Sequence, residues 1–208
     1  MYVPEAFRES RPEALRDLIR QHSFGTLVSS TPSGLFATHV PFLLDPERGP
    51  HGTLVGHMAR ANDHWRFLDG DADVLVLFQG PHAYVSPAWY TTPLAVPTWN
   101  YVAVHAYGRP VLVQEGSRLL DILERTVRTY EAQFAYQWRP PDGDFVPRLA
   151  RQVVGFEIAL TRLEGKLKLS QNRSRADQQG TIEGLSQQAD PLARAVADLM
   201  AARLGPPA

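Results

Sequence analysis

The chain has 208 residues, of which 44% are hydrophobic and 21% are charged, and it contains no cysteine. These proportions are typical of a globular protein with its own core, and the lack of cysteine excludes a disulfide scaffold, an Fe–S cluster and thiol catalysis. The 21 basic residues balance 22 acidic ones, which argues against a protein that holds DNA mainly through its phosphates. No secretory signal and no apolar run near the ~20 residues of a membrane span is present, so we expect a cytoplasmic protein without membrane contact.

The first third of the chain is predicted to form two helices and three strands. Ser10 and Glu13 have the spacing of a capping box at a helix start. Pro41 cannot donate a backbone N–H, so its strand is predicted to lie at a sheet edge or to contain a bulge. The predicted helices cover residues 10–22 and 62–68, and the predicted strands cover residues 24–30, 35–44 and 53–58.

The rest of the chain predicts three further strands and two longer helices. Gly80 and Pro81 predict a turn that ends one strand, and Gly108 predicts a bulge or bend in another. Asp190 followed by Pro191 is typical of a helix start. The strands are predicted at residues 74–79, 98–113 and 153–163, with a brief extension at 82–86. The helices are predicted at 117–134 and from 190 to the break at Gly205, while residues 174–189 give no clear prediction.

The order of these elements favours one fold class. Strands mostly follow one another, and the helices stand at the start, the middle and the end of the chain. This order favours an antiparallel barrel or sheet over a doubly wound parallel sheet. Neither a G-x-G-x-x-G turn nor a P-loop motif is present. We therefore expect a mainly β fold with peripheral helices.

A candidate phosphate site lies in the segment GHMARANDHW at residues 56–65. Arg60 and Asn62 lie in the turn between a predicted strand and a predicted helix, where the first helical turn offers unpaired N–H groups. A guanidinium beside such a turn can bind a phosphate. In the alternative interpretation, Asn62 only caps the helix and Arg60 pairs with a surface carboxylate.

Two further segments contain residues that suit a flat, anionic ligand. In PTWNY at 97–101, two aromatic residues flank an asparagine and could line a flat ring, although two core aromatics beside a strand-start asparagine would give the same pattern. In GKLKLSQNR at 165–173, charged and amide side chains gather near a strand end, although a solvated hairpin explains them as well. The candidate residues are Trp99, Asn100, Tyr101, Lys168, Ser170, Gln171 and Asn172.

Metal and nucleophile motifs are not evident in the sequence. The seven histidines form neither an H-E-x-x-H motif nor a tight cluster with carboxylates, so no metal site is expected. No G-x-S-x-G elbow is present, and no catalytic residue is assigned. A haem site with one axial histidine leaves no spacing signature and stays open.

Taken together, these segments resemble the PaiB-like proteins, a family of FMN-binding negative transcriptional regulators. The resemblance covers nearly the whole chain, and it implies a homodimeric split β-barrel in which two chains hold FMN near their interface. The matching stretches are MYVPEAF at 1–7, GLFATHVPFLL at 34–44, LVGHMARANDHW at 54–65, FQGPHAYVSPAWY at 78–90, VPTWNYVAVHAYG at 96–108, VGFEIALTRLEGKLKLSQNR at 154–173 and D-x-x-G at 177–180.

The same resemblance implies which residues contact the cofactor. Arg60 is expected to contact the FMN phosphate with help from Asn62, and the SQNR segment is expected to face the polar edge of the flavin. The TWNY segment is expected at the cofactor or the dimer seam. The full expected set is His39, His57, Ala59, Arg60, Ala61, Asn62, Trp99, Asn100, Tyr101, Lys168, Ser170, Gln171 and Asn172.

The resemblance also implies a domain organisation and a function. A split-barrel domain would cover residues 1–173, with an inserted helix near 117–136, and a C-terminal helical extension would cover residues 174–208. We find no helix-turn-helix pair, so direct DNA binding is not expected, and regulation would act indirectly through flavin or small-molecule sensing. An NAD(P)H-dependent flavin reductase or another FMN oxidoreductase is the alternative, and a haem-handling barrel is a third interpretation.

Overall fold

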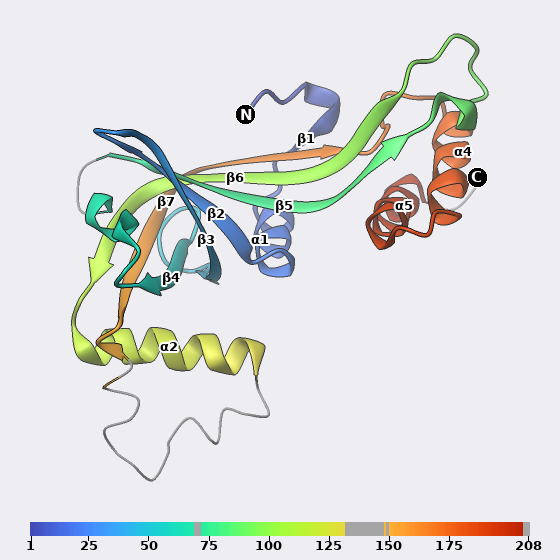
Figure 1. The fold of residues 1–208 in the computed structure, drawn as a ribbon. Helices are drawn as coiled ribbons and strands as arrows, with labels where there is room; N and C mark the ends of the chain where they lie inside the picture. Colours follow the sequence, from blue (N-terminus) through green and yellow to red (C-terminus); the bar gives the residue numbers. More distant parts are fainter. Residues whose placement is uncertain (69–71, 132–147, 149, 206–208) are drawn as a thin grey trace. The chain divides into compact units, whose positions relative to one another are not determined.

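The computed structural model describes residues 1–68, 72–131, 148 and 150–205, and Figure 1 shows strands as its main elements. The strands are β1 (Arg8–Glu9), β2 (Phe24–Thr31), β3 (Gly34–Asp45), β4 (Thr53–Ala59), β5 (Val74–Val85), β6 (Thr98–Val113) and β7 (Val153–Lys168). The helices are α1 (Pro12–Gln21), α2 (Gly116–Tyr130), α4 (Arg175–Ser186) and α5 (Pro191–Leu204), with 3-10 helices η1 (Glu5–Phe7), η2 (Asp63–Phe67) and η3 (Pro87–Trp89).

The strands form one sheet in the order β1-β7-β4-β3-β2-β5-β6, and a further pairing of β7 with β6 closes it. The pairs for which a register is defined are antiparallel, as between β4 and β7, which pair from Thr53↔Ala159 to Ala59↔Val153. Gly108 lies where β6 approaches β7, since a Cβ on this residue would lie 2.2 Å from the Ala159 carbonyl oxygen. Only glycine permits that close approach. The predicted mainly β fold with peripheral helices is confirmed.

Pro41 lies inside the sheet, and the prediction of an edge strand is wrong. The strand β3 changes its partner at this residue. Pairing with β2 ends at Phe24↔Pro41, and pairing with β4 begins at Phe42↔Gly56. The hydrogen-bond ladder of β3 passes from β2 to β4 at this residue, so the missing N–H of Pro41 costs the sheet little.

Two strands, β5 and β7, continue several residues beyond their predicted ends. The predicted turn at Gly80 and Pro81 is wrong, because β5 continues through both residues to Val85; the fixed φ of proline is compatible with an extended chain. The last strand, β7, continues past residue 163 to Lys168, where it pairs with β1 through Arg8↔Lys166. No local pattern in the sequence encodes that distant pairing.

The helices follow local signals where these exist. The Ser174 side chain accepts a hydrogen bond from the Asp177 N–H at the start of α4, in the segment without a clear prediction. Asp190 caps α5 in the same manner, as predicted. The predicted helix near residues 117–136 corresponds to α2, which ends at Tyr130, while residues 132–136 lie outside the described part of the chain.

The chain divides into two compact units, and β5, β6 and β7 have residues in both. The barrel unit consists of Arg16–Phe78 and His105–Leu163, and the helical unit consists of Met1–Leu15, Gln79–Val104 and Glu164–Ala208. The domain boundary predicted after residue 173 stays a prediction. The barrel unit has a core cluster of Leu43, Val55, Val113 and Ile122, through which α2 packs on the strands, and in the helical unit α4 packs against α5.

Candidate functional site

His57 lies on β4 in the barrel unit and has a polar atom without a partner. The residue is half-buried, and its buried Nδ1 atom makes no hydrogen bond within the described residues. Burial also lowers the pKa of His57, so the neutral ring is favoured. A buried polar atom without a partner is costly unless a ligand or water completes it. A ligand or a water could complete this atom, and the expected contact of His57 with FMN stays a prediction.

Arg60 follows β4, and its side chain is exposed. Its Nε donates to the carbonyl oxygen of Arg151 at 3.0 Å, and one Nη donates to that of Val153 at 3.1 Å. The guanidinium also lies 5.8 Å from the centre of the Trp65 ring. No carboxylate in the described ranges forms an ion pair with Arg60. The side chain is thus oriented by neutral groups, and its charge remains available to an anion.

Asn62 shapes the turn after β4 through bonds within the protein. Its Oδ1 accepts from the backbone N–H of His64 at 3.1 Å, and its Nδ2 donates to the Thr38 hydroxyl at 3.1 Å. Both ends of the carboxamide are therefore engaged. This geometry supports the capping interpretation of Asn62, while its expected contact with the FMN phosphate stays a prediction.

His64 completes this network, although nothing in the sequence distinguished it from the other histidines. Its ring is fully buried, and its two nitrogens bond the hydroxyls of Thr38 at 2.7 Å and Ser29 at 2.9 Å. Burial lowers the pKa of His64, and the Phe36 ring lies 4.7 Å from it. Because every polar atom of this ring is satisfied, we assign His64 to the support of the turn.

The other expected residues of the barrel unit lie at the surface. His39 on β3 is exposed, shares a hydrogen bond of 2.9 Å with the Thr26 hydroxyl, and stacks against Phe24. Ala59 and Ala61 flank Arg60 and are exposed. Their short side chains cannot cover a guanidinium, so Arg60 stays accessible.

In the helical unit, Trp99 at the start of β6 presents an aromatic surface. It is 53% exposed, its ring centre lies 6.2 Å from that of Tyr84, and the two rings are nearly perpendicular. The ring of His82 lies 6.3 Å away. Exposed aromatic side chains gathered on neighbouring strands can stack on a flat ring.

Cationic side chains gather at the end of β7 in the same unit. Nζ of Lys168 donates to the Trp99 carbonyl oxygen at 2.9 Å and also to the Thr98 hydroxyl. Burial lowers the pKa of Lys168, and the charges of Lys166 and Arg173 lower it further. A cluster of like charges of this kind attracts an anionic group.

Three expected contact residues of this unit make their bonds inside the protein. Asn100 is fully buried and donates from Nδ2 to the Ser170 hydroxyl at 2.9 Å and to Sδ of Met200 at 3.3 Å. Oε1 of Gln171 accepts from the Leu169 N–H at 2.7 Å. These contacts hold the end of β7 in place. Tyr101 is half buried beneath the Lys166 ammonium and Asn172 is exposed; their expected roles stay predictions.

One further cluster was not assigned a role from the sequence. Asp177 on α4 accepts hydrogen bonds from the backbone N–H groups of Thr91 at 2.8 Å and Thr92 at 3.0 Å, and from both hydroxyls. These bonds hold the pKa of Asp177 far below its usual range. Trp89 packs on the same helix, because a Cβ on Gly184 would lie 2.3 Å from its ring. These contacts hold the loop before β6 against α4. The S-x-x-D capping box at 174–177 is the sequence pattern that could have predicted the start of this helix.

The expected residues thus form two groups, one in each unit, and both groups fit the chemistry of FMN. The barrel unit offers an exposed guanidinium and an unsatisfied ring nitrogen, which suit a phosphate. The helical unit offers an exposed indole and neighbouring cations, which suit a flavin ring with polar edges. In the part of the chain that is described, no group of three or more His, Cys, Asp or Glu side chains could hold a metal ion, and no helix is long and apolar enough to cross a membrane.

The antiparallel sheet and these two groups of residues are compatible with a flavin-binding split barrel. The chain belongs to the family described as "Putative FMN-binding domain", whose model matches residues 1–162. It is 34% identical over 206 residues to protease synthase and sporulation protein PAI 2 of Bacillus subtilis, with 98% of each chain covered. It is also 30% identical to uncharacterized protein AN0679 of Emericella nidulans, with 98% of this chain and 97% of that protein covered. The predicted PaiB-like family and FMN cofactor are confirmed.

Solved structures show the same fold at low sequence identity. The flavocytochrome Anf3 of Azotobacter vinelandii superposes with a TM-score of 0.63 at 12% identity, covering 80% of this chain and 72% of that one. The FAD and heme binding protein of Mycobacterium smegmatis gives a TM-score of 0.61 at 13% identity, covering 77% and 73%. These likenesses confirm the split-barrel fold.

Proposed function

We propose that the protein is an FMN-binding homodimeric regulator of the PaiB type and that Arg60 binds the FMN phosphate. The observation that carries this assignment is the exposed Arg60 guanidinium, which two backbone carbonyl oxygens orient while no described carboxylate neutralises it. A bond between a guanidinium and a phosphate is charge-assisted and is about twice as strong as a neutral one. His57 supplies the unsatisfied ring nitrogen on the strand that leads to Arg60.

In the homodimer that the family implies, where two chains hold FMN, the aromatic surface of Trp99 is proposed to stack on the flavin ring, with the Lys168 ammonium at a polar edge of that ring. When bound, FMN would supply redox chemistry at this site. The residues of the chain bind and orient the cofactor, and the exposed Trp99 provides apolar area for that purpose. Lys168 is held by the backbone of Trp99 itself, so the ring and the charge are positioned together.

The homodimer in this proposal rests on the PaiB-like family. Phe24 and Leu35 of the β2–β3 hairpin are 68% and 80% exposed. They lie at opposite ends of the hairpin, opposite Pro41 and Ser30, so they do not form one apolar patch. A second copy of this chain is the partner that the PaiB-like family implies.

The regulatory role is proposed to be indirect, through the flavin or another small molecule, in the cytoplasm. The Bacillus subtilis relative is named for protease synthase and sporulation, which supports a role in cellular control. Balanced net charge gives little support to direct DNA binding. Reduction or loss of bound FMN would then be the signal that the protein reports.

The proposal is tested by the visible spectrum of the purified protein before and after addition of FMN, together with the mass of the native complex. We expect a bound-flavin spectrum at one FMN per chain in a dimer. No uptake in excess FMN would overturn the proposal, and a Soret band with added haem would then favour a haem-handling barrel. Steady NAD(P)H oxidation by the loaded protein would favour the reductase alternative over a sensor.

A further inference from the structure

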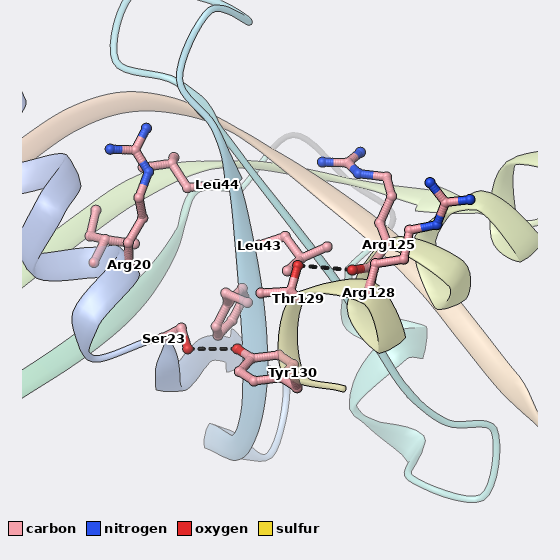
Figure 2. A pocket seen from close by; sticks show the side chains of 10 residues that line it. Arg20, Ser23, Leu43, Leu44, Arg125, Arg128, Thr129 and Tyr130 are labelled. Atoms are coloured by element: carbon pink, nitrogen blue, oxygen red, sulfur yellow. Dashed lines mark hydrogen bonds between the residues drawn. The ribbon is translucent and has the colours of Figure 1, made fainter. Parts of the chain in front are cut away.

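A cavity of about 550 Å³ lies in the barrel unit between the end of α1, the strand β3 and the end of α2. Figure 2 shows Arg20 from α1 on one side of it and Arg125 and Arg128 from α2 on the other. The lining contains none of the residues expected to contact FMN. It consists of Ile19, Arg20, Ser23, Phe42, Leu43, Leu44, Arg125, Arg128, Thr129 and Tyr130.

The cavity wall combines an apolar surface with three positive charges. Phe42 and Leu43 are buried core residues whose side chains contribute to the wall. Arginines supply the charge, and no acidic side chain belongs to the ten lining residues. This composition matches a molecule that carries a negative group on an apolar body.

The acidic partners of the three arginines lie outside the lining. Arg20 pairs with Asp17 at 2.9 Å and Arg128 pairs with Glu124 at 2.7 Å, each within its own helix. Exposed pairs of this spacing contribute little to stability, so a ligand can compete with them for the guanidinium groups. Arg125 is held by Asp45 of β3, which fixes the third charge in place.

Hydroxyl groups add hydrogen-bonding capacity at the same wall. The hydroxyls of Ser23 and Tyr130 share a bond of 2.6 Å that joins the end of the α1 connection to the last residue of α2, as Figure 2 shows. A hydroxyl has one donor and two acceptor positions, so this pair keeps acceptor capacity for a polar ligand group. The contact also holds two sides of the cavity together.

We propose that this cavity binds a small amphipathic organic anion, with its carboxylate, sulfonate or phosphate at Arg20 and Arg128 and its apolar body against Phe42 and Leu43. Its volume lies within the range of roughly 300–1,000 Å³ found for small-molecule sites. This is a second ligand site, separate in its residues from the proposed FMN site. It gives the protein a place to sense a metabolite besides the flavin.

Calorimetric titration of the FMN-saturated full chain with 1-anilinonaphthalene-8-sulfonate tests the proposal. Saturation with FMN prevents the probe from occupying the flavin site. The double variant Arg20→Gln/Arg128→Gln is expected to weaken binding of the probe about tenfold or more. The control Arg118→Gln removes a charge from the same helix outside the cavity, where Arg118 pairs with Glu157, and is expected to leave the affinity unchanged.

A second variant and a second probe distinguish a charge-specific site from general apolar binding. Thr129→Trp places a large side chain at the exposed rim of the cavity and is expected to abolish binding. The neutral probe N-phenyl-1-naphthylamine is expected to bind the parent protein and the double variant equally. An anion affinity that neither variant changes would overturn the site, and an anion affinity that only Thr129→Trp lowers would overturn the assigned ligand class.

Discussion

The Asn100 carboxamide donates to the Ser170 hydroxyl over 2.9 Å and joins the start of β6 to the end of β7. Ser170 has a φ of 62°, in the left-handed region that non-glycine residues rarely adopt. Asn100 is fully buried and also contacts Met200 of α5. Asn100 and Ser170 therefore satisfy each other's hydrogen bonds, and their expected contacts with FMN stay predictions.

Replacing Asn100 with alanine is expected to lower the free energy of unfolding by about 1–3 kcal/mol, because the buried Ser170 hydroxyl loses its partner. Urea denaturation followed by tryptophan fluorescence measures the change. Asn172→Ala is the matched control, since Asn172 is exposed in the same segment and its removal should have little effect. Equal stability of the two variants would remove Asn100 from this structural role.

Gly184→Ala is expected to destabilise the helical unit. The added Cβ would lie 2.3 Å from the Trp89 ring, and overpacking of this kind costs about 1–3 kcal/mol. Gly116→Ala is the control, because nothing lies within 4 Å of a Cβ at that helical position. Thermal unfolding should show a lower midpoint for Gly184→Ala and an unchanged or higher one for Gly116→Ala. An unchanged midpoint for both would contradict the packing of Trp89 on α4.

Glu9 is expected to make stability depend on pH in the acid range. Bonds from the Arg11 guanidinium at 2.9 and 2.8 Å lower the pKa of Glu9 from 4.5 to about 2. The folded state thus favours the carboxylate, and its contribution is complete above pH 4.5 and is lost as the pH falls toward 2.

Urea denaturation at several pH values measures this contribution. Glu9→Gln should be less stable than the parent at pH 7, and the difference should shrink between pH 4.5 and pH 2. Glu5→Gln is the control, because its pair with Arg8 is exposed and contributes little. A difference between parent and Glu9→Gln that stays constant with pH would contradict the assigned role of the carboxylate.

Local signals in the sequence predicted those elements that depend only on neighbouring residues. Asn62 caps η2, and Asp190 with Pro191 begins α5, as their patterns predicted. The end of β7 depends on its pairing with Arg8 and Glu9 at the other end of the chain. No periodicity within residues 153–168 contains that information, so the strand was predicted too short.

The residues of the candidate site likewise include some that local sequence signals indicated and others that depend on distant parts of the chain. The charge and exposure of Arg60 follow from its place in a turn after a strand, and the sequence indicated them. The mutual satisfaction of Asn100 and Ser170 requires two strand ends to meet, and motif composition cannot distinguish this from ligand binding. The cavity at Arg20 and Arg128 depends on two helices far apart in the chain, so no motif indicated it.

Binding of FMN and of riboflavin to the parent protein and to Arg60→Ala tests the central claim most directly, because riboflavin lacks the phosphate. Fluorescence titration should show FMN affinity reduced by about 1.5–3 kcal/mol, or roughly 10- to 150-fold, with riboflavin affinity unchanged. Arg66→Ala is the matched control, since Arg66 lies over the same Trp65 ring but pairs with Asp63. Unchanged FMN affinity in Arg60→Ala, or an equal loss for FMN and riboflavin, would contradict the assignment of Arg60 to the phosphate.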